Sequence, residues 1–406
     1  MPGHRIVVVG ASLAGVHAAE ELRAAGYDGD VVLLGAEEGL PYDRPPLSKK
    51  FLAGPAAEET LLRSPEQFAE LGIELVAGHR AIGLDTVRQR IALAEGEAVE
   101  YDGLVIATGS RARRPRFLDG LGGVHTLRTL QDARSLRAAF TGSPRVAVLG
   151  GGFIGAEVAA TARGLGLDVT LVEALETPLA ASLGPTIGGV LAAAHNDRGV
   201  QVACGVPLDR VEGDGRVERL VLADGTRIDA DLLVVGVGAE PVTDWLRTSG
   251  LALRDGVLCD SYCATAVPRI MAAGDVARWQ HPRLGEVRAE HHANAVEQGA
   301  AAARNLLASP AERQPYAPVG YVWSDQYEHR LQIIGTCRPS DELVIVHGSL
   351  EARAFVACYL RDGQISGAVG LDARRQLMRM RPLIDAGADR EALLAAVGPA
   401  PAAANG

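Results

Sequence analysis

Two short glycine-rich segments carry the residue types and spacing that bind a dinucleotide. In the segment GGGFIG, Gly150, Gly152 and Gly155 fit the spacing G-x-G-x-x-G. In such a turn the first glycine permits a sharp bend, the second lets backbone N–H groups approach a pyrophosphate, and the third lets the helix pack closely on the strand. Glu173 ends the next apolar run, and a carboxylate there accepts hydrogen bonds from a ribose 2′-OH and repels a 2′-phosphate. This segment predicts a site for NADH rather than NADPH, with a purely structural turn as the alternative.

The first glycine segment departs from this pattern, because it reads Gly10, Ser12, Gly15. A serine at the middle position still leaves its N–H free and adds a hydroxyl that could contact a phosphate. The apolar run VVLLG is followed by Ala36 and then by Glu37. We take Glu37 as the ribose ligand of a second dinucleotide; the alternative is an ordinary surface acid.

A third candidate phosphate contact is Gly274-Asp275, where the apolar run of IMAAGDVA ends. A carboxylate beside a backbone N–H at a strand end can hold the ribityl chain and phosphates of FAD, although a simple turn would look the same. Two nucleotide segments in one chain are what hydride transfer from NADH to FAD needs, since nicotinamide C4 must stack on the flavin near N5. The sequence therefore predicts FAD and NADH as cofactors.

Each glycine segment belongs to the same pattern of an apolar strand, a glycine turn, a helix rich in Ala and Leu, and a second apolar strand. The two copies begin at Arg5 and Arg145 and predict βαβ units on parallel sheets. The expected fold is α/β, with two Rossmann-like dinucleotide-binding domains and a smaller α+β C-terminal domain. We assign 1–111 and 241–316 to FAD, 112–240 to NADH, and 317–406 to the C-terminal domain, whose tail GPAPAAANG is expected to be disordered.

Composition limits the possible partners and the compartment. The 406 residues carry a formal charge of −10, which gives no reason to expect nucleic acid or an anionic membrane as a partner. The five cysteines form no C-x-x-C pair, and an odd number of cysteines in a chain of this length suits a reducing compartment. No uncharged run approaches the ~18 residues that span a bilayer, and Gly10 and Gly15 interrupt an apolar start that imitates a signal peptide. We expect a cytoplasmic protein without a metal site.

Several segments, taken in order, carry a family resemblance. They are ASLAG, RPPLSK, YDGLVIATGS, LRTLQDA, GGGFIGAEVAATA, IMAAGDVA and WSDQY. The chain resembles the FAD-dependent NADH:ferredoxin reductases of bacterial oxygenase systems, the group of putidaredoxin reductase and biphenyl dioxygenase ferredoxin reductase, within the glutathione-reductase-like flavoproteins. The likeness extends over residues 5 to 380, and the combination of RPPLSK with WSDQY is its specific part.

The resemblance implies that Lys49 lies close to the flavin N5 and that Glu157 faces it near the nicotinamide. A lysine there stabilises the anion of the reduced flavin, and a carboxylate can pair with the lysine when the nicotinamide is absent. Trp323 is implied to lie near the isoalloxazine and to pass electrons toward the partner. The alternatives are a solvated loop lysine, an ordinary helix glutamate and a tryptophan that only packs in the core. The nearest cysteine to RPPLSK in the sequence is Cys204, so the segment offers the flavin no sulfur to reduce. The electrons must then leave the flavin one at a time, to an outside acceptor.

Further positions complete the two predicted cofactor sites. The remaining predicted FAD residues are Ala14, Arg44, Ala81, Thr108, Gly109, Arg128 and His292, and the remaining NAD residues are Ile154 and Gly238. His291 and His292 depart from the family, which often has an apolar or aromatic residue in this segment. This histidine pair could modulate the flavin potential or cap a helix.

The resemblance implies a [2Fe-2S] ferredoxin as partner, which supplies a haem-thiolate monooxygenase (cytochrome P-450) or a Rieske-type oxygenase. Ferredoxins are usually acidic, so a chain of charge −10 needs a local cationic face. One candidate is RARRPR, residues 111–116, at the expected domain crossing. The favoured candidate consists of Arg374, Arg375, Arg379 and Arg381, with a solvated helix face as its alternative.

Three other functions fit the same fold at this stage. They are a rubredoxin reductase, an NADH oxidase that gives hydrogen peroxide, and a non-enzymatic flavoprotein that resembles apoptosis-inducing factor. We expect a monomer or a weak homodimer.

Overall fold

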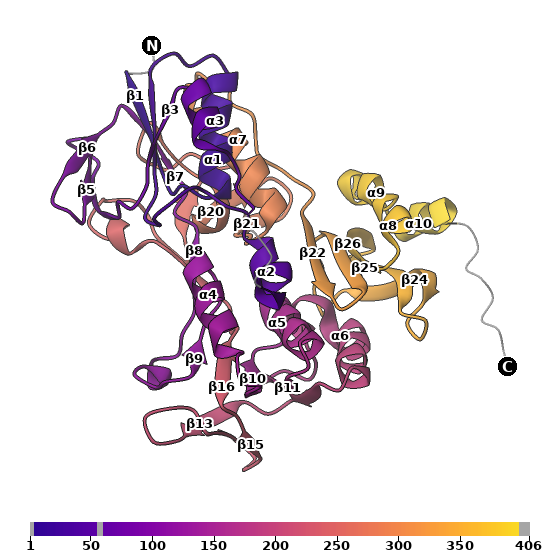
Figure 1. Cartoon of the computed structure of the whole chain (residues 1–406). Helices are drawn as coiled ribbons and strands as arrows, with labels where there is room; N and C mark the ends of the chain where they lie inside the picture. Colours follow the sequence, from indigo (N-terminus) through magenta and orange to yellow (C-terminus); the bar gives the residue numbers. More distant parts are fainter. Residues whose placement is uncertain (1–3, 55–59, 398–406) are drawn as a thin grey trace. The chain divides into compact units, whose positions relative to one another are not determined.

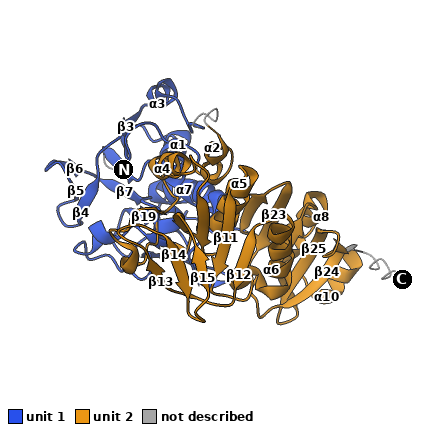
Figure 2. Ribbon diagram, turned by 60° about the horizontal axis from the view of Figure 1, so that its bottom comes forward, with its two compact units in different colours: residues 1–43, 59–111, 239–318 blue, residues 44–58, 112–238, 319–406 orange. Residues whose placement is uncertain are grey.

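We describe a computed structural model of the chain, which covers residues 4–54 and 60–397 (Figure 1). The tail at 398–406, expected to be disordered, lies outside the described residues. The chain divides into two compact units (Figure 2). Unit 1 consists of Met1–Asp43, Glu59–Arg111 and Ala239–Pro318, and unit 2 of Arg44–Glu58, Ala112–Gly238 and Val319–Gly406. The assignment of three functional domains stays a prediction.

Unit 1 is built around a parallel sheet with the strand order β19-β7-β1-β2-β3. Its strands are β1 (Arg5–Val9), β2 (Asp30–Leu34), β3 (Ile73–Val76), β7 (Gly103–Ile106) and β19 (Ile270–Ala272). The apolar runs of β1, β7 and β19 are buried almost throughout, as expected for parallel strands covered on both faces. The helices α1 (Leu13–Ala24) and α7 (His292–Leu307) pack against each other beside this sheet (Figure 1).

Smaller elements complete unit 1. Two three-stranded sheets have the strand orders β4-β5-β6 and β18-β20-β21. Their strands are β4 (Ala81–Asp85), β5 (Arg90–Leu93), β6 (Ala98–Glu100), β18 (Val257–Cys259), β20 (Ala277–His281) and β21 (Gly285–Val287). The helix α3 (Pro65–Glu70) begins with a capping box, in which the Ser64 and Gln67 side chains each bond the other's backbone. The remaining elements are β8 (Ser110–Ala112) and β17 (Ala239–Pro241), which lie where the chain crosses between units, and the 3₁₀ turns η3 (Asp244–Leu246) and η4 (Gly274–Val276).

The first part of unit 2 repeats the same architecture. Its parallel sheet has the strand order β12-β11-β10-β16-β9. The strands are β9 (Val124–His125), β10 (Arg145–Leu149), β11 (Asp168–Glu173), β12 (Gln201–Cys204) and β16 (Leu232–Val235). The helices around it are α2 (Lys50–Ala53), α4 (Leu130–Ala139), α5 (Phe153–Gly164) and α6 (Ala180–Asp197), with the 3₁₀ turns η1 (Pro45–Ser48) and η2 (Arg116–Leu118). A side ribbon consists of β13 (Leu208–Glu212), β14 (Arg219–Leu222) and β15 (Arg227–Asp229).

The second part of unit 2 is an antiparallel sheet with the order β22-β23-β26-β25-β24. Its elements are β22 (Tyr321–Gln326), β23 (His329–Gly335), β24 (Glu342–Ser349), β25 (Ala354–Arg361), β26 (Gln364–Leu371), α8 (Arg374–Met378), α9 (Arg381–Ala386) and α10 (Arg390–Val397). Strand β25 is buried on both faces because its alternate residues enter two cores. Cys358 packs in a core with Leu377 and Ile384 of the terminal helices, whereas Tyr359 packs in a core with Leu191 of α6. Helix α6 is thereby fixed to the antiparallel sheet.

Candidate redox site

The two glycine turns have the same backbone geometry. Gly10 follows β1 with φ +116°, and Gly150 follows β10 with φ +100°, a region that favours glycine. A Cβ atom on Gly10 would lie 2.1 Å from the carbonyl oxygen of Ala107, and one on Gly150 would lie 2.5 Å from that of Gly236. Both positions therefore require glycine for conformation and for space.

The third glycine of each turn lets the helix begin directly against the turn. A Cβ atom on Gly15 would lie 1.9 Å from the carbonyl oxygen of Gly10, and one on Gly155 would lie 1.9 Å from that of Gly150. These contacts are the close approach that the sequence pattern predicts for the third glycine.

The middle position differs between the two turns, and the structure explains why a serine is allowed there. Ser12 has φ −120° and Gly152 has φ −72°, both with extended ψ, so neither backbone needs glycine. A Cβ atom on Gly152 would meet no atom closer than the Gly236 carbonyl oxygen at 4.0 Å, so the space in front of α5 is open. The first turns of α1 and α5 contain no acidic residue. Both helix starts thus fit a pyrophosphate.

The two predicted ribose ligands are held differently. Glu173, the last residue of β11, accepts a hydrogen bond from the Gly151 N–H at 2.7 Å and another from the Leu175 N–H at 2.9 Å. Glu37 is exposed, and its Oε2 accepts a hydrogen bond from the Tyr42 hydroxyl at 2.6 Å. The carboxylate of Glu173 is therefore fixed beside its glycine turn by backbone donors, whereas that of Glu37 is fixed by a side chain.

Unit 1 gathers several predicted FAD residues at the carboxyl ends of its parallel strands. Gly274, with φ +75°, leaves so little room that a Cβ atom would lie 2.9 Å from Cβ of Ala14. Asp275 is buried, and its Oδ2 accepts a hydrogen bond from the Ser110 hydroxyl at 2.7 Å. The Thr108 hydroxyl donates to the Val242 carbonyl at 2.8 Å. Carboxyl ends of adjacent parallel strands are where α/β sheets bind nucleotides.

The other predicted FAD residues are more dispersed. Gly109 has φ +66°, Ala81 begins β4, and Arg44 of unit 2 donates to the Arg128 carbonyl at 2.7 Å. A ring nitrogen of His292 lies 3.1 Å from an Asp43 carboxylate oxygen. Of the predicted NAD residues, Ile154 lies in the first turn of α5 and has an exposed side chain, and Gly238 has φ +94°.

His291 occupies the N-cap position of α7 without a side-chain capping hydrogen bond. Burial lowers the pKa of His291 below its ordinary value, and the Asp275 carboxylate partly opposes this shift. Of the two roles left open for the histidine pair, side-chain capping by His291 is therefore absent.

Lys49 and Glu157 meet in unit 2, as the resemblance implies. The Lys49 Nζ atom lies 2.7 Å from Oε2 of Glu157, whose side chain is 3% exposed. The same oxygen accepts a hydrogen bond from the Ser48 hydroxyl at 2.5 Å. The other oxygen, Oε1, accepts from the Ser324 hydroxyl at 2.8 Å and from the Asp325 N–H at 3.3 Å. This buried carboxylate is thus paired with a cation and surrounded by donors, which is what burial of a charge requires.

Sequence reasoning missed Ser48 and Ser324. Both stand next to a residue that was singled out, since Ser48 precedes Lys49 in RPPLSK and Ser324 follows Trp323 in WSDQY. Their position inside the two most specific motifs of the sequence is the signal that could have identified them.

Trp323 is half-buried on β22. Its ring stacks on that of Tyr321 with centroids 5.9 Å apart, and the Arg330 guanidinium lies 5.7 Å from the ring centroid. Stacking and a cation over the ring fix the orientation of the indole.

The five cysteines are free thiols. Burial raises the pKa of Cys204 to about 11, and that of Cys259 and Cys358 to about 12. It also raises the pKa of Cys263 and Cys337. Thiols in this state are poor nucleophiles and poor redox partners at neutral pH.

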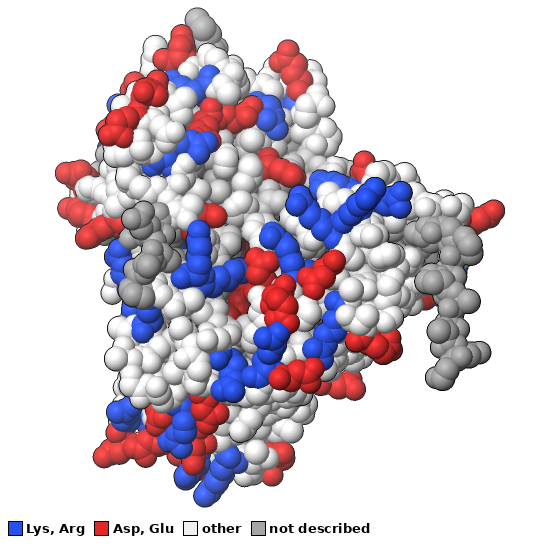
Figure 3. Space-filling view, turned by 45° about the vertical axis from the view of Figure 1, so that its right-hand side comes forward, with Lys and Arg blue, Asp and Glu red and all other residues white. Residues whose placement is uncertain are grey.

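The two basic runs are arranged differently. Arg111 forms ion pairs with Glu240 and Asp244 of the same unit. Arg374, Arg375 and Arg379 have exposed side chains on and after α8, and Arg381 begins α9 half-buried. On the face drawn in Figure 3, basic and acidic side chains intermingle, and a few clusters are predominantly basic.

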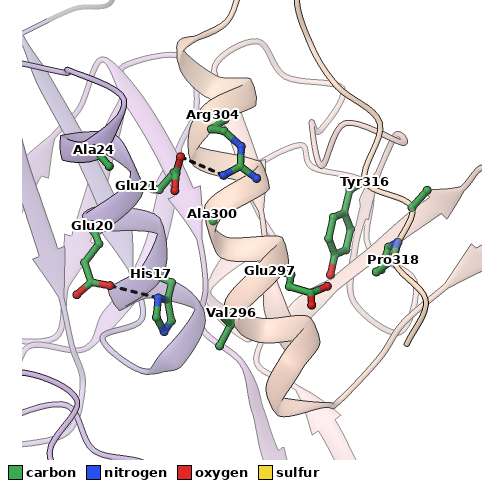
Figure 4. Close-up of a pocket in the computed structure, with 11 residues that line it drawn as sticks. His17, Glu20, Glu21, Ala24, Val296, Glu297, Ala300, Arg304, Tyr316 and Pro318 are labelled. Atoms are coloured by element: carbon green, nitrogen blue, oxygen red, sulfur yellow. Dashed lines mark ion pairs between the residues drawn. The ribbon is translucent and has the colours of Figure 1, made fainter. Parts of the chain in front are cut away.

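An open groove of about 650 Å³ lies between α1 and α7 in unit 1 (Figure 4). An ion pair joins Glu21 to Arg304 across it at 3.0 Å, and His17 contacts Glu20 at 3.2 Å along its wall. The groove contains none of the predicted cofactor residues.

Residues 4–54 and 60–397 lack two features that would suggest another class of protein. Within these ranges no helix is long and apolar enough to cross a membrane. Over the same part of the chain, no group of three or more His, Cys, Asp or Glu side chains could hold a metal ion.

Comparisons with known proteins agree with this geometry. A family model described as "Pyridine nucleotide-disulphide oxidoreductase" matches residues 4–299, and one described as "Reductase C-terminal" matches residues 321–398. The chain is 37% identical over 372 residues to the biphenyl dioxygenase system ferredoxin–NAD(+) reductase component of Paraburkholderia xenovorans (strain LB400), covering 91% of this chain and 90% of that one. It is 36% identical over 370 residues to putidaredoxin reductase of Pseudomonas putida, covering 89% and 86%.

Solved structures give the same result. In the crystal structure of the covalent putidaredoxin reductase–putidaredoxin complex, the matching chain has 32% identity and a TM-score of 0.90, with 97% of this chain and 96% of that chain covered. The predicted resemblance, the fold class and the prediction of an oxidoreductase are confirmed by these matches. Two dinucleotide turns, a reductase-type C-terminal region and relatives that match along nearly the whole chain lead to one conclusion: the chain belongs to the pyridine nucleotide-disulphide oxidoreductase family.

Proposed function

We propose that the chain is an NADH-dependent, FAD-containing ferredoxin reductase that passes single electrons to a [2Fe-2S] ferredoxin. The observation that carries the proposal is the ion pair of Lys49 with the buried Glu157, whose carboxylate also accepts from two hydroxyl groups, in a chain with two dinucleotide turns. The relatives support it, because their names describe ferredoxin–NAD(+) reductases, and one solved structure joins such a reductase to putidaredoxin.

Unit 1 binds FAD through the turn that contains Gly10, Ser12 and Gly15 and through the start of α1. Glu37 binds the adenosine ribose, while Gly274 and Asp275 bind the ribityl and phosphate region. Further FAD contacts come from Ala14, Arg44, Ala81, Thr108, Gly109, Arg128 and His292. The position of these residues at the carboxyl ends of the parallel strands and the absence of acids in the first turn of α1 support this assignment. Residues 1–111 and 241–316 then form the FAD domain.

The turn that contains Gly150, Gly152 and Gly155 binds the NADH pyrophosphate, with Ile154 and Gly238 beside it. Glu173 accepts the ribose hydroxyls and selects against a 2′-phosphate by charge repulsion. Its carboxylate is already held beside the turn by the Gly151 N–H, which supports this role. Residues 112–240 then form the NADH domain, and 317–406 the C-terminal domain.

FAD, when bound, accepts a hydride from NADH and returns electrons one at a time. Lys49 supplies a positive charge that stabilises negative charge on the reduced cofactor, because the ammonium is screened little in a partly buried site. Glu157 neutralises Lys49 while the nicotinamide is absent, so the ammonium is never left without a partner. Trp323 lies on the electron path toward the ferredoxin.

The ferredoxin docks on a face that includes Arg374, Arg375, Arg379 and Arg381, which attract an acidic partner despite the net charge of −10. The ferredoxin serves a cytochrome P-450 or a Rieske-type oxygenase in the cytoplasm, and the reductase is a monomer or a weak homodimer.

The test is to purify the protein with FAD and to follow NADH oxidation with and without an acidic [2Fe-2S] ferredoxin, using cytochrome c as the final acceptor. We expect slow turnover without the ferredoxin and a strong increase with it. Fast NADH consumption with peroxide release and no carrier would replace the proposal by an NADH oxidase. A reduced flavin that persists in air with or without ferredoxin would replace it by a binding flavoprotein.

A further inference from the structure

A continuous line of hydrogen bonds leads from the surface of unit 2 to Glu157. The Tyr327 hydroxyl lies 2.8 Å from Nδ1 of His195, and Nε2 of His195 lies 3.2 Å from Oε1 of Gln326. Nε2 of Gln326 donates to the Ser324 hydroxyl at 3.2 Å, and Ser324 donates to Glu157 at 2.8 Å. We call these five residues the Tyr327–Glu157 chain.

Three elements of unit 2 build the chain. His195 lies near the end of α6, and Glu157 lies on α5. Ser324 and Gln326 are two residues apart on β22, so both point to the same, buried face of the strand. Tyr327 follows immediately in the turn to β23.

The chemistry of the groups allows one direction of donation. The Glu157 carboxylate only accepts, so Ser324 must donate its proton to it. Ser324 then accepts from the amide nitrogen of Gln326, which leaves the Gln326 oxygen to accept from N–H at Nε2 of His195. Neutral His195 has one N–H, so its Nδ1 must accept from the Tyr327 hydroxyl. All four bonds therefore point toward Glu157.

Burial removes water as an alternative hydrogen-bond partner for most of these groups. His195 and Ser324 are 0% exposed, and Gln326 and Glu157 are nearly as buried. Burial lowers the pKa of His195 to about 4, consistent with a neutral ring that accepts at Nδ1. A buried polar network whose members are all satisfied fixes a unique arrangement, because any broken bond leaves an unpaired group away from water.

The far end of the chain is held in a costly conformation. Tyr327 has φ +58°, a left-handed backbone that is strained for an aromatic residue. Its ring packs edge-on against His195 with centroids 5.3 Å apart, and the Arg198 guanidinium lies 5.4 Å from its centroid. Arg198 is in turn paired with Glu328 in the same turn. The strained turn thus places the hydroxyl on the histidine.

We infer that the Tyr327–Glu157 chain positions Glu157 and keeps its carboxylate hydrogen-bonded when Lys49 turns from it toward the cofactor. The inference deepens the proposed function and rests on it, because only a reductase cycle requires Lys49 to exchange partners. The two oxygens of Glu157 have separate donors. Oε2 is bound by Lys49 and Ser48, whereas Oε1 is bound by the Ser324 end of the chain. When Lys49 leaves, Oε1 keeps its donors.

The chain positions and polarises without conducting protons. Proton hopping through Gln326 would require its carboxamide to pass through an unfavourable imidic acid form. Aligned donors instead strengthen one another, and a hydrogen bond to a charged acceptor is about twice as strong as a neutral one. His195, Gln326 and Ser324 are therefore positioning residues that act through Glu157.

The first test is a double-mutant cycle on the FAD-loaded protein, read by hydrogen exchange of the backbone amides of β22. Gln326→Leu is expected to reduce amide protection about 5- to 30-fold when Glu157 is present, and clearly less in the Glu157→Gln background. The matched control is Gln332→Leu, a buried glutamine on β23 whose amide donates to the Tyr321 hydroxyl at 2.6 Å. The control loss should be equal in both backgrounds. Equal losses for Gln326→Leu in both backgrounds would overturn the inference.

The second test compares two replacements of His195. Glutamine can place an amide N–H where Nε2 stands and so keep the bond to Gln326, whereas asparagine can reach only the Nδ1 position. His195→Asn is expected to lower the rate constant of flavin reduction about fivefold with an unchanged KM for NADH, and His195→Gln to restore it. A merely structural role would make the two variants alike or move KM, and either result would contradict the inference.

The two proposals fail separately. A wild-type protein that does not reduce ferredoxin would remove the proposed function but leave the coupling of Gln326 to Glu157 measurable. A reductase with full activity and no coupling would remove only the positioning role.

Discussion

The ammonium of Lys49 lies 2.7 Å from a carboxylate oxygen of Glu157, which follows 108 residues later in the chain. Lys49 comes from the short segment between η1 and α2, and Glu157 from the middle of α5, so the pair joins two separate segments of unit 2. Because the carboxylate is buried, its charge needs a partner in the folded protein, and Lys49 supplies one.

Replacement of Lys49 by a neutral residue should lower the stability of unit 2. Lys49→Gln leaves a buried carboxylate without its counter-ion, and we expect the free energy of unfolding of unit 2 to fall by about 3 kcal/mol. Lys50→Gln is the matched control, since Lys50 is exposed and its loss should stay within about 0.5 kcal/mol. Urea denaturation measures both. Similar values for the two variants would mean that the ion pair does not stabilise the fold.

The second glycine turn separates binding from folding. Gly152→Ala should leave stability nearly unchanged, because its Cβ atom meets nothing within 4 Å but a carbonyl oxygen at 4.0 Å, while the methyl group enters the space proposed for the pyrophosphate. NADH affinity should fall at least about tenfold. Gly155→Ala should lower stability by about 3 kcal/mol or more, because its Cβ atom would lie 1.9 Å from a backbone oxygen. Thermal unfolding and an NADH titration distinguish the two, and a folded Gly152→Ala protein with normal affinity would refute the assigned pyrophosphate site.

Glu173 should set the choice of nicotinamide cofactor. Glu173→Gln removes the negative charge that repels a 2′-phosphate, so the preference for NADH over NADPH in kcat/KM should fall by about 10- to 100-fold. Glu176→Gln, at an exposed acid on the same segment, should leave the preference unchanged. Steady-state kinetics with both cofactors measure the ratio. An unaltered preference in Glu173→Gln would assign the selectivity to another residue.

Burial of His195 makes stability depend on pH in a defined range. Its pKa is lowered by burial from 6.5 to about 4, so between these values the unfolded chain binds a proton that the folded chain does not. The stability contribution is therefore complete above pH 6.5 and is lost as the pH falls toward 4, by about 3 kcal/mol in total. His195→Gln cannot titrate and should lack this part of the slope. Denaturation curves of both proteins from pH 4 to 7.5 measure the difference, and parallel curves would show that the His195 pKa is not lowered.

The arginines after β26 should govern the encounter with an acidic ferredoxin. Reversing the charge in Arg375→Glu with Arg379→Glu should raise the KM for ferredoxin about tenfold or more and flatten its dependence on salt, without altering flavin reduction by NADH. Arg390→Glu is a control on α10, where the arginine is already paired with Glu342. Turnover against ferredoxin concentration at two ionic strengths measures the effect. An unchanged KM would place the docking face elsewhere.

Local chemistry explains what could be predicted from the sequence. The two glycine turns are predictable because the positive φ of Gly10 and Gly150 and the tight contacts of Gly15 and Gly155 are demands of a few adjacent residues. The serine at position 12 was an ambiguity that the backbone resolves, since that position is extended and accepts any residue.

Long-range packing explains what could not be predicted. His195 and Gln326 are 131 positions apart and meet only because α6 packs on the antiparallel sheet. His195 belongs to no motif, so it is indistinguishable in sequence from an ordinary buried histidine on a helix, and Gln326 lies in WSDQY without a role that the motif assigns to it. The pairing of Lys49 with Glu157 came from family resemblance alone, for the same reason.

The order of the strands has a consequence for how the protein folds during synthesis. Strand β7 pairs with β19 through Leu104 and Ile270, and all the strands of the unit 2 parallel sheet are made between these two residues. At about 5–20 residues per second, β7 waits on the ribosome for roughly 10–30 s before its outer neighbour emerges. During that time β7 is an unpaired, apolar sheet edge, which can pair with another chain. The parallel sheet of unit 1 should therefore be completed after that of unit 2, and its β7 edge is where the nascent chain most depends on a chaperone.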